Sequence, residues 1–140
     1  MTVPVVREHD TAVAAAVATI GRPVATGRAP DGALAALLAG TGPGYYVLYP
    51  IPGGARDGAV ADPWADVELV YQITCVDIGP EGARWLSDRL EAVIAAVTVP
   101  DRKVVWVQPT FPSRVWPDDD TADRTLFFTT PTFRIRTTPL

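Results

Sequence analysis

The clearest pattern in the chain is a strict alternation of apolar and mostly polar residues between positions 66 and 75. The apolar positions are Val67, Leu69, Tyr71, Ile73 and Cys75. A period of two is typical of a β-strand that buries one face and leaves the other to solvent. We therefore expect a strand here, in a sheet that is covered on one side.

Two longer segments have the helical period. Residues 3–19 place valines and alanines at spacings of three and four, and a glycine and a proline then end the pattern. Residues 80–97 carry a second apolar stripe, made of Leu86, Leu90, Val93, Ile94 and Val97. Residues 31–38 predict a third, short helix. The segment 40–44 is rich in glycine but leads into a strand and lacks the lysine of a phosphate-binding loop, which indicates a turn.

The remaining apolar segments are predicted to be extended. They are residues 24–28, 45–51, 103–108, 125–130 and 132–138, with Pro131 dividing the last two. Segment 103–108 is nearly all apolar, which predicts a central strand with Trp106 in the core. Residues 52–65 and 109–124 are expected to be long loops. This order predicts an α+β fold in one domain, residues 1–140, with a mixed, mostly antiparallel sheet and two main helices packed on one face.

Composition narrows the classes of function. The chain has 140 residues, of which 48% are hydrophobic, and a net charge of −4. Its arginines do not form a basic cluster, which argues against direct binding of nucleic acid by a basic face. One cysteine excludes an intrachain disulfide. No apolar run approaches the roughly 20 residues that cross a bilayer, and no leader segment is recognisable, so we expect a cytoplasmic protein without a membrane partner.

The residues that most often carry catalysis or bind metals are sparse. His9 lies between Glu8 and Asp10, which predicts a solvated histidine on the charged side of the first helix. Cys75 belongs to the apolar face of the predicted strand, where a thiol is a small hydrophobic group rather than a nucleophile. With one histidine and one cysteine, the usual zinc ligand sets are excluded. We expect no catalytic residue, no metal and no cofactor.

Carboxylates and tryptophans gather in the two long loops. The run from Asp118 to Asp120, followed by Asp123, lacks the alternation and central glycine of a calcium loop. Asp57, Asp62 and Asp66 belong to the other loop, and a carboxylate pair flanking a sugar bond stays open as an alternative. The loop tryptophans, Trp64 and Trp116, are candidates for contacts with other proteins, or each covers its own domain.

A series of short signatures along the chain is similar to a known family. They are the helix leading to Arg28-Ala29-Pro30, the segments 45–50, 52–54, 62–66, 70–74 and 83–89, and near the end Asp118-Asp119 and 133–135. Together they resemble the tail terminator (tail completion) proteins of long-tailed bacteriophages, over residues 3–138. The short segment 33–38 looks like a local addition to that pattern.

The resemblance implies a structural virion protein rather than an enzyme. Proteins of this family form a homo-oligomeric ring, usually a hexamer, at the head-proximal end of the tail tube. The ring stops tube polymerisation and forms the surface that joins the head. The implied partners are further copies of the chain, the tail tube protein and a head-completion or connector protein, while genome DNA passes through without specific binding. The implied location is the virion, after assembly in the host cytoplasm.

Two alternatives remain at this stage. One is a head-closure or head–tail adaptor subunit, and the other is a small ligand-binding or hydrolytic α+β domain that uses the loop carboxylates. For a ring that conducts DNA, acidic groups along the lumen would keep the duplex off the wall; they could equally solvate the outer rim. The candidate interface or lumen residues are Asp57, Asp62, Trp64, Asp66, Trp116, Asp118, Asp119 and Asp120.

Overall fold

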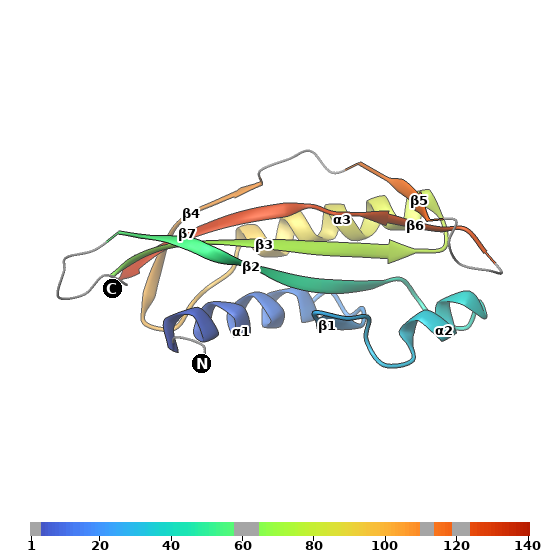
Figure 1. Cartoon of the computed structure of the whole chain (residues 1–140), viewed down its shortest axis with the longest axis horizontal. Helices are drawn as coiled ribbons and strands as arrows, with labels where there is room; N and C mark the ends of the chain where they lie inside the picture. Colours follow the sequence, from blue (N-terminus) through green and yellow to red (C-terminus); the bar gives the residue numbers. More distant parts are fainter. Residues whose placement is uncertain (1–3, 58–64, 110–113, 119–123) are drawn as a thin grey trace.

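A long antiparallel hairpin organises the fold. The computed structural model describes residues 4–57, 65–109, 114–118 and 124–140. The hairpin strands are β2 (Tyr45–Asp57) and β3 (Asp66–Asp77). The other elements are α1 (Pro4–Ala18), β1 (Val24–Thr26), α2 (Ala33–Leu38), α3 (Pro80–Ala95), β4 (Arg102–Pro109), β5 (Trp116–Asp118), β6 (Leu126–Thr129) and β7 (Thr132–Pro139) (Figure 1). The predicted α+β class is confirmed.

The strand β3 is the centre of a mixed, mostly antiparallel sheet. On one side it pairs with β2, which in turn pairs with the short parallel strand β1. On the other side it pairs with β7 along its first part and with β6 at its end. Strand β4 lies beside β7, and β5 lies beside β6 (Figure 1). As predicted, Pro131 separates β6 from β7, and its carbonyl oxygen accepts a hydrogen bond from the backbone N–H of Ile73 at 3.0 Å.

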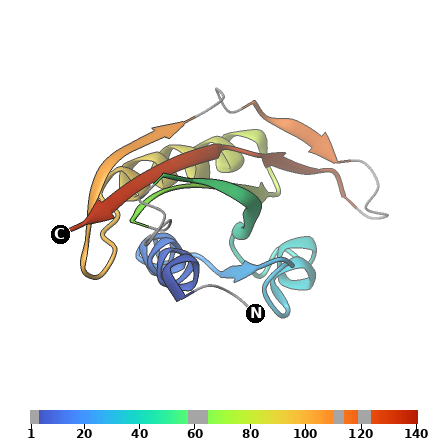
Figure 2. The same ribbon diagram turned by 60° about the vertical axis from the view of Figure 1, so that its left-hand side comes forward.

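The helices α1 and α3 cover one face of this sheet and enclose the main core. The strands arch over α1 (Figure 2). The alternating apolar residues predicted for β3 are all buried in this core, as are most of the predicted stripe residues of α3. Phe133 and Ile135 of β7 join them, whereas Arg134 and Arg136 lie on the opposite face. Burial of a full leucine or isoleucine side chain contributes about 1.5–3 kcal/mol, so this core is the main source of stability.

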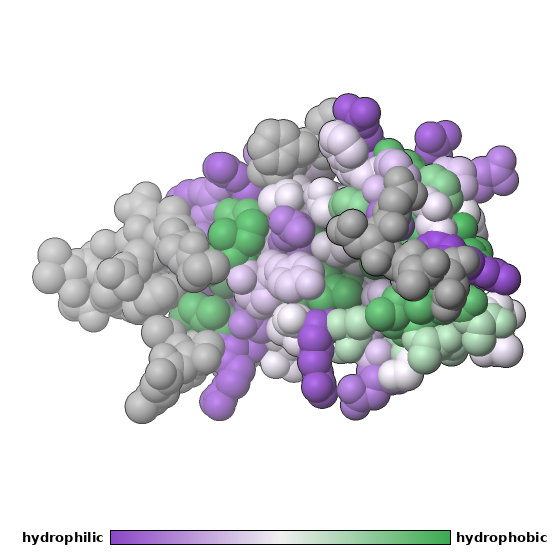
Figure 3. Space-filling view, turned by 45° about the vertical axis from the view of Figure 1, so that its right-hand side comes forward, coloured by the Kyte–Doolittle hydropathy of each residue, from purple (hydrophilic) through white to green (hydrophobic). Residues whose placement is uncertain are grey.

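The opposite face of the sheet, called the outer face below, is covered by α2 at one end. Ala33 and Leu37 of α2 form a second cluster with Tyr45, Val47 and Leu126. Successive side chains of a strand point to opposite faces, so the neighbours of Tyr45 and Val47 in β2 go to the main core instead. On the face shown in Figure 3, hydrophobic residues gather at the end of the molecule where α2 lies.

Three sequence predictions about strands were wrong. Residues 109–124 were expected to be a loop, but Trp116–Asp118 pairs with β6 as the strand β5. Strand β2 does not stop at Ile51 but continues to Asp57, because after a register shift β3 again provides partners for Ala55, Arg56 and Asp57. Strand β4 is not central: among the described residues it pairs with β7 alone. Trp106 is accordingly half-buried rather than part of the core. A bulge between Val104 and Trp106 breaks the alternation that a central strand would need.

The open edge of β2 is blocked by a proline. The N–H of Tyr46 donates to the carbonyl of Pro23, and the carbonyl of Leu48 accepts from the N–H of Gly27, each at 2.9 Å. Backbone groups of alternate residues point to the same edge, so residue 50 directs its backbone to this side too, beyond the end of β1. Pro50 has no N–H to offer there. A proline at such a position discourages the addition of a foreign strand.

Candidate interaction surfaces

The described candidate residues lie at two ends of the sheet. Asp57 and Asp66 are cross-strand partners at the end of the β2–β3 hairpin. Trp116 and Asp118 belong to β5, whose partner β6 pairs with the far end of β3 (Figure 1). At about 3.3 Å per residue, the length of β3 separates these ends by roughly 36 Å. The other four candidates lie outside the described residues: Asp62, Trp64, Asp119 and Asp120.

A groove on the outer face lies next to β5. It has a volume of about 270 Å³ and is lined by Leu34, Tyr45, Thr74, Val76, Asp118, Leu126 and Phe128. Trp116 faces Phe128 across the β5–β6 pair and is 42% exposed. The guanidinium carbon of Arg114 lies 4.0 Å from the centroid of its ring. Farther along β2, Tyr49 and Ile51 are also exposed, at 39% and 40%. The outer face therefore carries several large apolar side chains that the domain itself does not cover.

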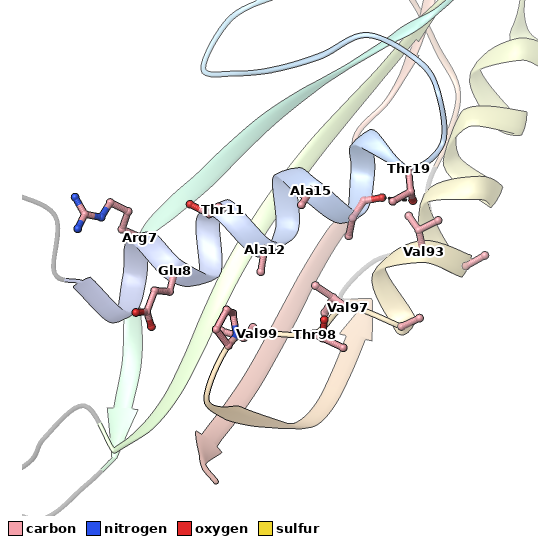
Figure 4. Close-up of a pocket in the computed structure, with 14 residues that line it drawn as sticks. Arg7, Glu8, Thr11, Ala12, Ala15, Thr19, Val93, Val97, Thr98 and Val99 are labelled. Carbon is pink, nitrogen blue, oxygen red and sulfur yellow. Dashed lines mark hydrogen bonds between the residues drawn. The ribbon is translucent and has the colours of Figure 1, made fainter.

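A larger groove separates α1 from the end of α3 (Figure 4). Its volume is about 940 Å³. Small side chains of both helices line it, including Ala12 and Ala15 of α1. Val97, Thr98 and Val99 close one side, and the charged Arg7 and Glu8 stand at the end nearest the start of α1 (Figure 4). The residues that line the groove are mostly small or apolar, and Arg7 and Glu8 are the charged ones among them.

An aromatic side chain on the helix layer is flanked by two arginines. Trp85 of α3 is 37% exposed. The guanidinium carbons of Arg22 and Arg89 lie 4.8 Å and 5.2 Å from the centroid of its ring. Both charges also act on the nearby phenol of Tyr46: burial raises the pKa of Tyr46, and the two arginines oppose that shift. Nothing in the sequence placed Arg22, which comes from the loop after α1, beside Trp85 of α3.

His9 is buried, and the prediction of a solvated histidine was wrong. Its Nδ1 lies 2.6 Å from the carbonyl oxygen of Val5, and its Nε2 lies 2.6 Å from Oγ1 of Thr137. The same Oγ1 accepts a hydrogen bond from Nε of Arg102 at 2.8 Å. Another nitrogen of Arg102 donates to the carbonyl of Ala65 beside the hairpin. The network thus ties α1, β4, β7 and the start of β3 together.

The hydrogen bonds fix the protonation state of His9. A carbonyl oxygen only accepts, so Nδ1 carries the proton and donates to Val5. The hydroxyl of Thr137 accepts from Arg102 and donates to the unprotonated Nε2. Burial lowers the pKa of His9 below its ordinary value of 6.5, and the positive charge of Arg102 adds to this, while the Val5 carbonyl and the nearby carboxylates of Asp10 and Glu8 oppose it. The neutral imidazole is therefore the form that fits the native network.

Cys75 is buried in the core, as predicted. Burial raises the pKa of its thiol to about 12, and its sulfur lies 3.7 Å from the carbonyl oxygen of Ile73. A protonated, inaccessible thiol is a poor nucleophile. Within the described ranges, no three His, Cys, Asp or Glu side chains are grouped so that they could hold a metal ion. No described helix is long and apolar enough to span a bilayer.

Comparisons with known proteins add little about function. No protein family model matches the sequence, and no curated protein matches it. Several solved structures match; one of them is aligned over 97% of this chain and 96% of its own, at 17% sequence identity and a TM-score of 0.46. That likeness is too distant to carry an argument about activity or partners.

Proposed function

We propose that this chain is a ring-forming structural protein, the tail terminator of a long-tailed bacteriophage. The resemblance along the sequence motivates the family, and the α+β fold with two main helices agrees with what that resemblance implies. The observation that carries the proposal is the set of exposed apolar side chains on the outer face, with Leu34 and Trp116 at the groove and Tyr49 and Ile51 farther along β2. Large exposed apolar patches mark surfaces that another protein covers.

The edges of the sheet restrict how copies associate. Pro50 removes a donor from the open edge of β2, and β4 at the other edge has a bulge and a lysine. These features discourage strand addition. Copies would then associate through faces and side chains. A contact between two different surfaces is heterologous, and it closes into a ring when the rotation between subunits closes.

The hydrolytic alternative cannot combine the carboxylates of the two loops in one site. Two carboxyl groups that act on one sugar bond lie within about 10 Å of each other. Asp66 and Asp118 lie at ends of the sheet that are separated by roughly 36 Å. A head-closure or adaptor subunit is the second candidate of the same structural class. It would bind the head rather than the end of the tail tube.

Electron microscopy and native mass spectrometry of the purified chain test the proposal. We expect a closed ring, either alone or when tail tubes are added, and we expect the ring to sit at one end of each tube. Tubes that keep growing in its presence, or binding to heads without tubes, would favour the adaptor function. A strict monomer under all conditions, with tubes present, would contradict ring formation altogether.

A further inference from the structure

We infer that the contact between His9, Thr137 and Arg102 is an acid-sensitive latch, which holds the start of β3 at the end of the β2–β3 hairpin. When the imidazole takes up a proton, the guanidinium of Arg102 leaves its place. This end of the hairpin is then released, while the rest of the sheet stays folded. The inference goes beyond the proposed function and does not depend on it, because it concerns a response of the single chain to pH.

The first argument is the position of Arg102 in the sheet. This residue begins β4, and its side chain reaches past the neighbouring β7 to the residue before β3. Its Nε donates to Oγ1 of Thr137 at 2.8 Å. Another of its nitrogens donates to the backbone carbonyl of Ala65 and, at 3.3 Å, to that of Thr137. Ala65 directly precedes Asp66, with which the pairing of β2 and β3 ends, so one guanidinium ties β4 and β7 to this end of the hairpin.

The second argument is that one hydroxyl group serves both His9 and Arg102. Oγ1 of Thr137 accepts from Nε of Arg102 and donates its single proton to Nε2 of His9, 2.6 Å away. An imidazolium carries an N–H at both ring nitrogens, so it cannot accept that proton. Its Nε2 would donate to the same oxygen instead. Two positive charges would then lie within two hydrogen-bond lengths of each other, at a buried hydroxyl where water screens them little.

The third argument decides which of the two charges moves. His9 is fully buried between α1 and β7, and the carbonyl of Val5 holds its Nδ1, so displacing it would open the main core. Arg102 is only partly buried, and a long arginine side chain can turn its charged end into water. Water then replaces the hydrogen bonds that the guanidinium gives up. The repulsion is therefore relieved by loss of the Ala65 contact, which is a local opening and leaves the core intact.

The charged groups that face His9 set the direction of the response. Burial lowers the pKa of His9, and the charge of Arg102 lowers it further. The carboxylates of Asp10 and Glu8 oppose this shift, as does the carbonyl that Nδ1 contacts, and Asp10 itself accepts a hydrogen bond from Tyr71 at 2.7 Å. Once Arg102 has left, one of the lowering influences is gone, so the released state binds a proton more readily. Acid therefore shifts the population towards the released state.

An NMR titration of the isolated chain tests the inference. The imidazole nitrogens of His9, the Nε–H of Arg102 and the carbonyl carbon of Ala65 would be followed from about pH 7.5 to about pH 5. We expect all three signals to change with one midpoint, below the ordinary histidine pKa of 6.5. Protection of the amides of residues 66–67 from hydrogen exchange, corrected for the intrinsic effect of pH, should fall about tenfold, while that of residues 72–74 in the middle of β3 should hold.

Three variants identify the group that titrates. In His9→Gln, which has no ionisable ring, protection of the hairpin end should not depend on pH in this range. In Arg102→Gln, loss of the neighbouring cation should move the midpoint of His9 to higher pH. Asp10→Asn is the matched control for titration of a carboxylate. It should keep the response but move the midpoint to lower pH, because the lost charge favours the imidazolium. Circular dichroism checks that each variant is folded.

The result that would overturn the inference is a protonated His9 with Arg102 still in place. Unchanged signals of Arg102 and Ala65 across the titration of His9 would show this in the wild type, without any variant. A histidine that stays neutral until the whole domain unfolds would equally contradict the latch, because no local release would precede unfolding. Persistence of the response in His9→Gln, or its loss in Asp10→Asn, would assign the titration to a carboxylate and overturn the inference as well.

Discussion

At the scale of single residues, the polar network around His9 is the most constrained feature of the molecule. Its imidazole bonds at both nitrogens, at 2.6 Å each, and it is fully shielded from solvent. Tyr71 adds a second tie to the same helix by donating its hydroxyl proton to Asp10 at 2.7 Å. Removal of one partner of a buried hydrogen bond costs about 1–3 kcal/mol.

We predict that the stability of the fold falls as pH decreases below about 6.5. The native pKa of His9 is lowered relative to the unfolded value, so the unfolded chain binds more protons in this range and unfolding becomes more favourable. Each unit of lowering costs about 1.4 kcal/mol at the acidic end. Urea unfolding at several pH values measures this. His9→Gln should be less stable at pH 7.5 but show a flatter dependence between about pH 5 and 7; parallel curves would contradict the assignment.

We predict that Cys75→Ala lowers the free energy of unfolding by about 1–2 kcal/mol, through lost burial and a small cavity, and leaves assembly intact. Denaturant unfolding and light scattering are the two measurements. In the native wild type, iodoacetamide should react very slowly with this thiol, because its pKa is raised to about 12 and it is buried. A folded Cys75→Ala chain that fails to assemble would show that the thiol has a role beyond packing.

The position of His9 illustrates what the sequence did and did not contain. Its charged neighbours suggested an exposed site, but it precedes Val13 by four residues and Val17 by eight, which places it on the buried stripe of α1. That signal was available. The partner Thr137 was not, because it lies 128 residues away and only the completed sheet brings it close.

At the scale of elements, strong periodicity predicted α1, α3 and β3 to within a few residues. The errors concern strands whose surroundings decide the outcome. The prolines and glycines of residues 52–57 predicted a loop, yet the end of this segment pairs with β3. An edge strand tolerates prolines because their missing N–H groups can lie on the unpaired side. The apolar run in β4 read as central, although only its helix-facing residues meet the core and Val105 is exposed.

We predict that Pro50→Val promotes aggregation. The change restores an N–H on the open edge of β2 and raises β-propensity there, which creates a template for strand addition. Turbidity during slow heating and light scattering after storage are the measurements. Pro80→Ala is the matched control, because that proline begins α3, where a new N–H faces no strand edge. Equal aggregation of the two variants would contradict this function of Pro50.

At the scale of the whole molecule, charge constrains what a ring would do with DNA. With −4 per chain, a hexamer carries roughly −24, and duplex DNA has a negative charge about every 1.7 Å. We predict no measurable binding of isolated rings to duplex DNA at about 150 mM salt, where screening acts over about 8 Å. Fluorescence anisotropy tests this. A ring structure with a lumen lined mainly by Arg22, Arg28, Arg134 and Arg136 would contradict it.

The sequence could not predict that the carboxylates of the two loops lie at opposite ends of the sheet. Proximity in sequence grouped Asp57, Asp62 and Asp66, and separately the run from Asp118 to Asp120, but nothing local indicated how far apart the groups lie. The pairing of β3 with β6 and β7 determines that distance. The Arg22–Trp85–Arg89 cluster was missed for the same reason, because its members come from different elements.

The place of β7 inside the sheet has a consequence for synthesis. This strand follows every other element in the sequence, yet it lies between β3 and β4 and holds the hydroxyl that satisfies His9. At about 5–20 residues per second, the ribosome adds Thr137 some seconds to tens of seconds after His9. During that interval His9 of α1 lacks its hydrogen-bond partner Thr137, and the edge of β3 that pairs with β7 is exposed. The sheet therefore cannot be completed before β7 has been synthesised. We expect the incomplete nascent chain to depend on chaperones until then.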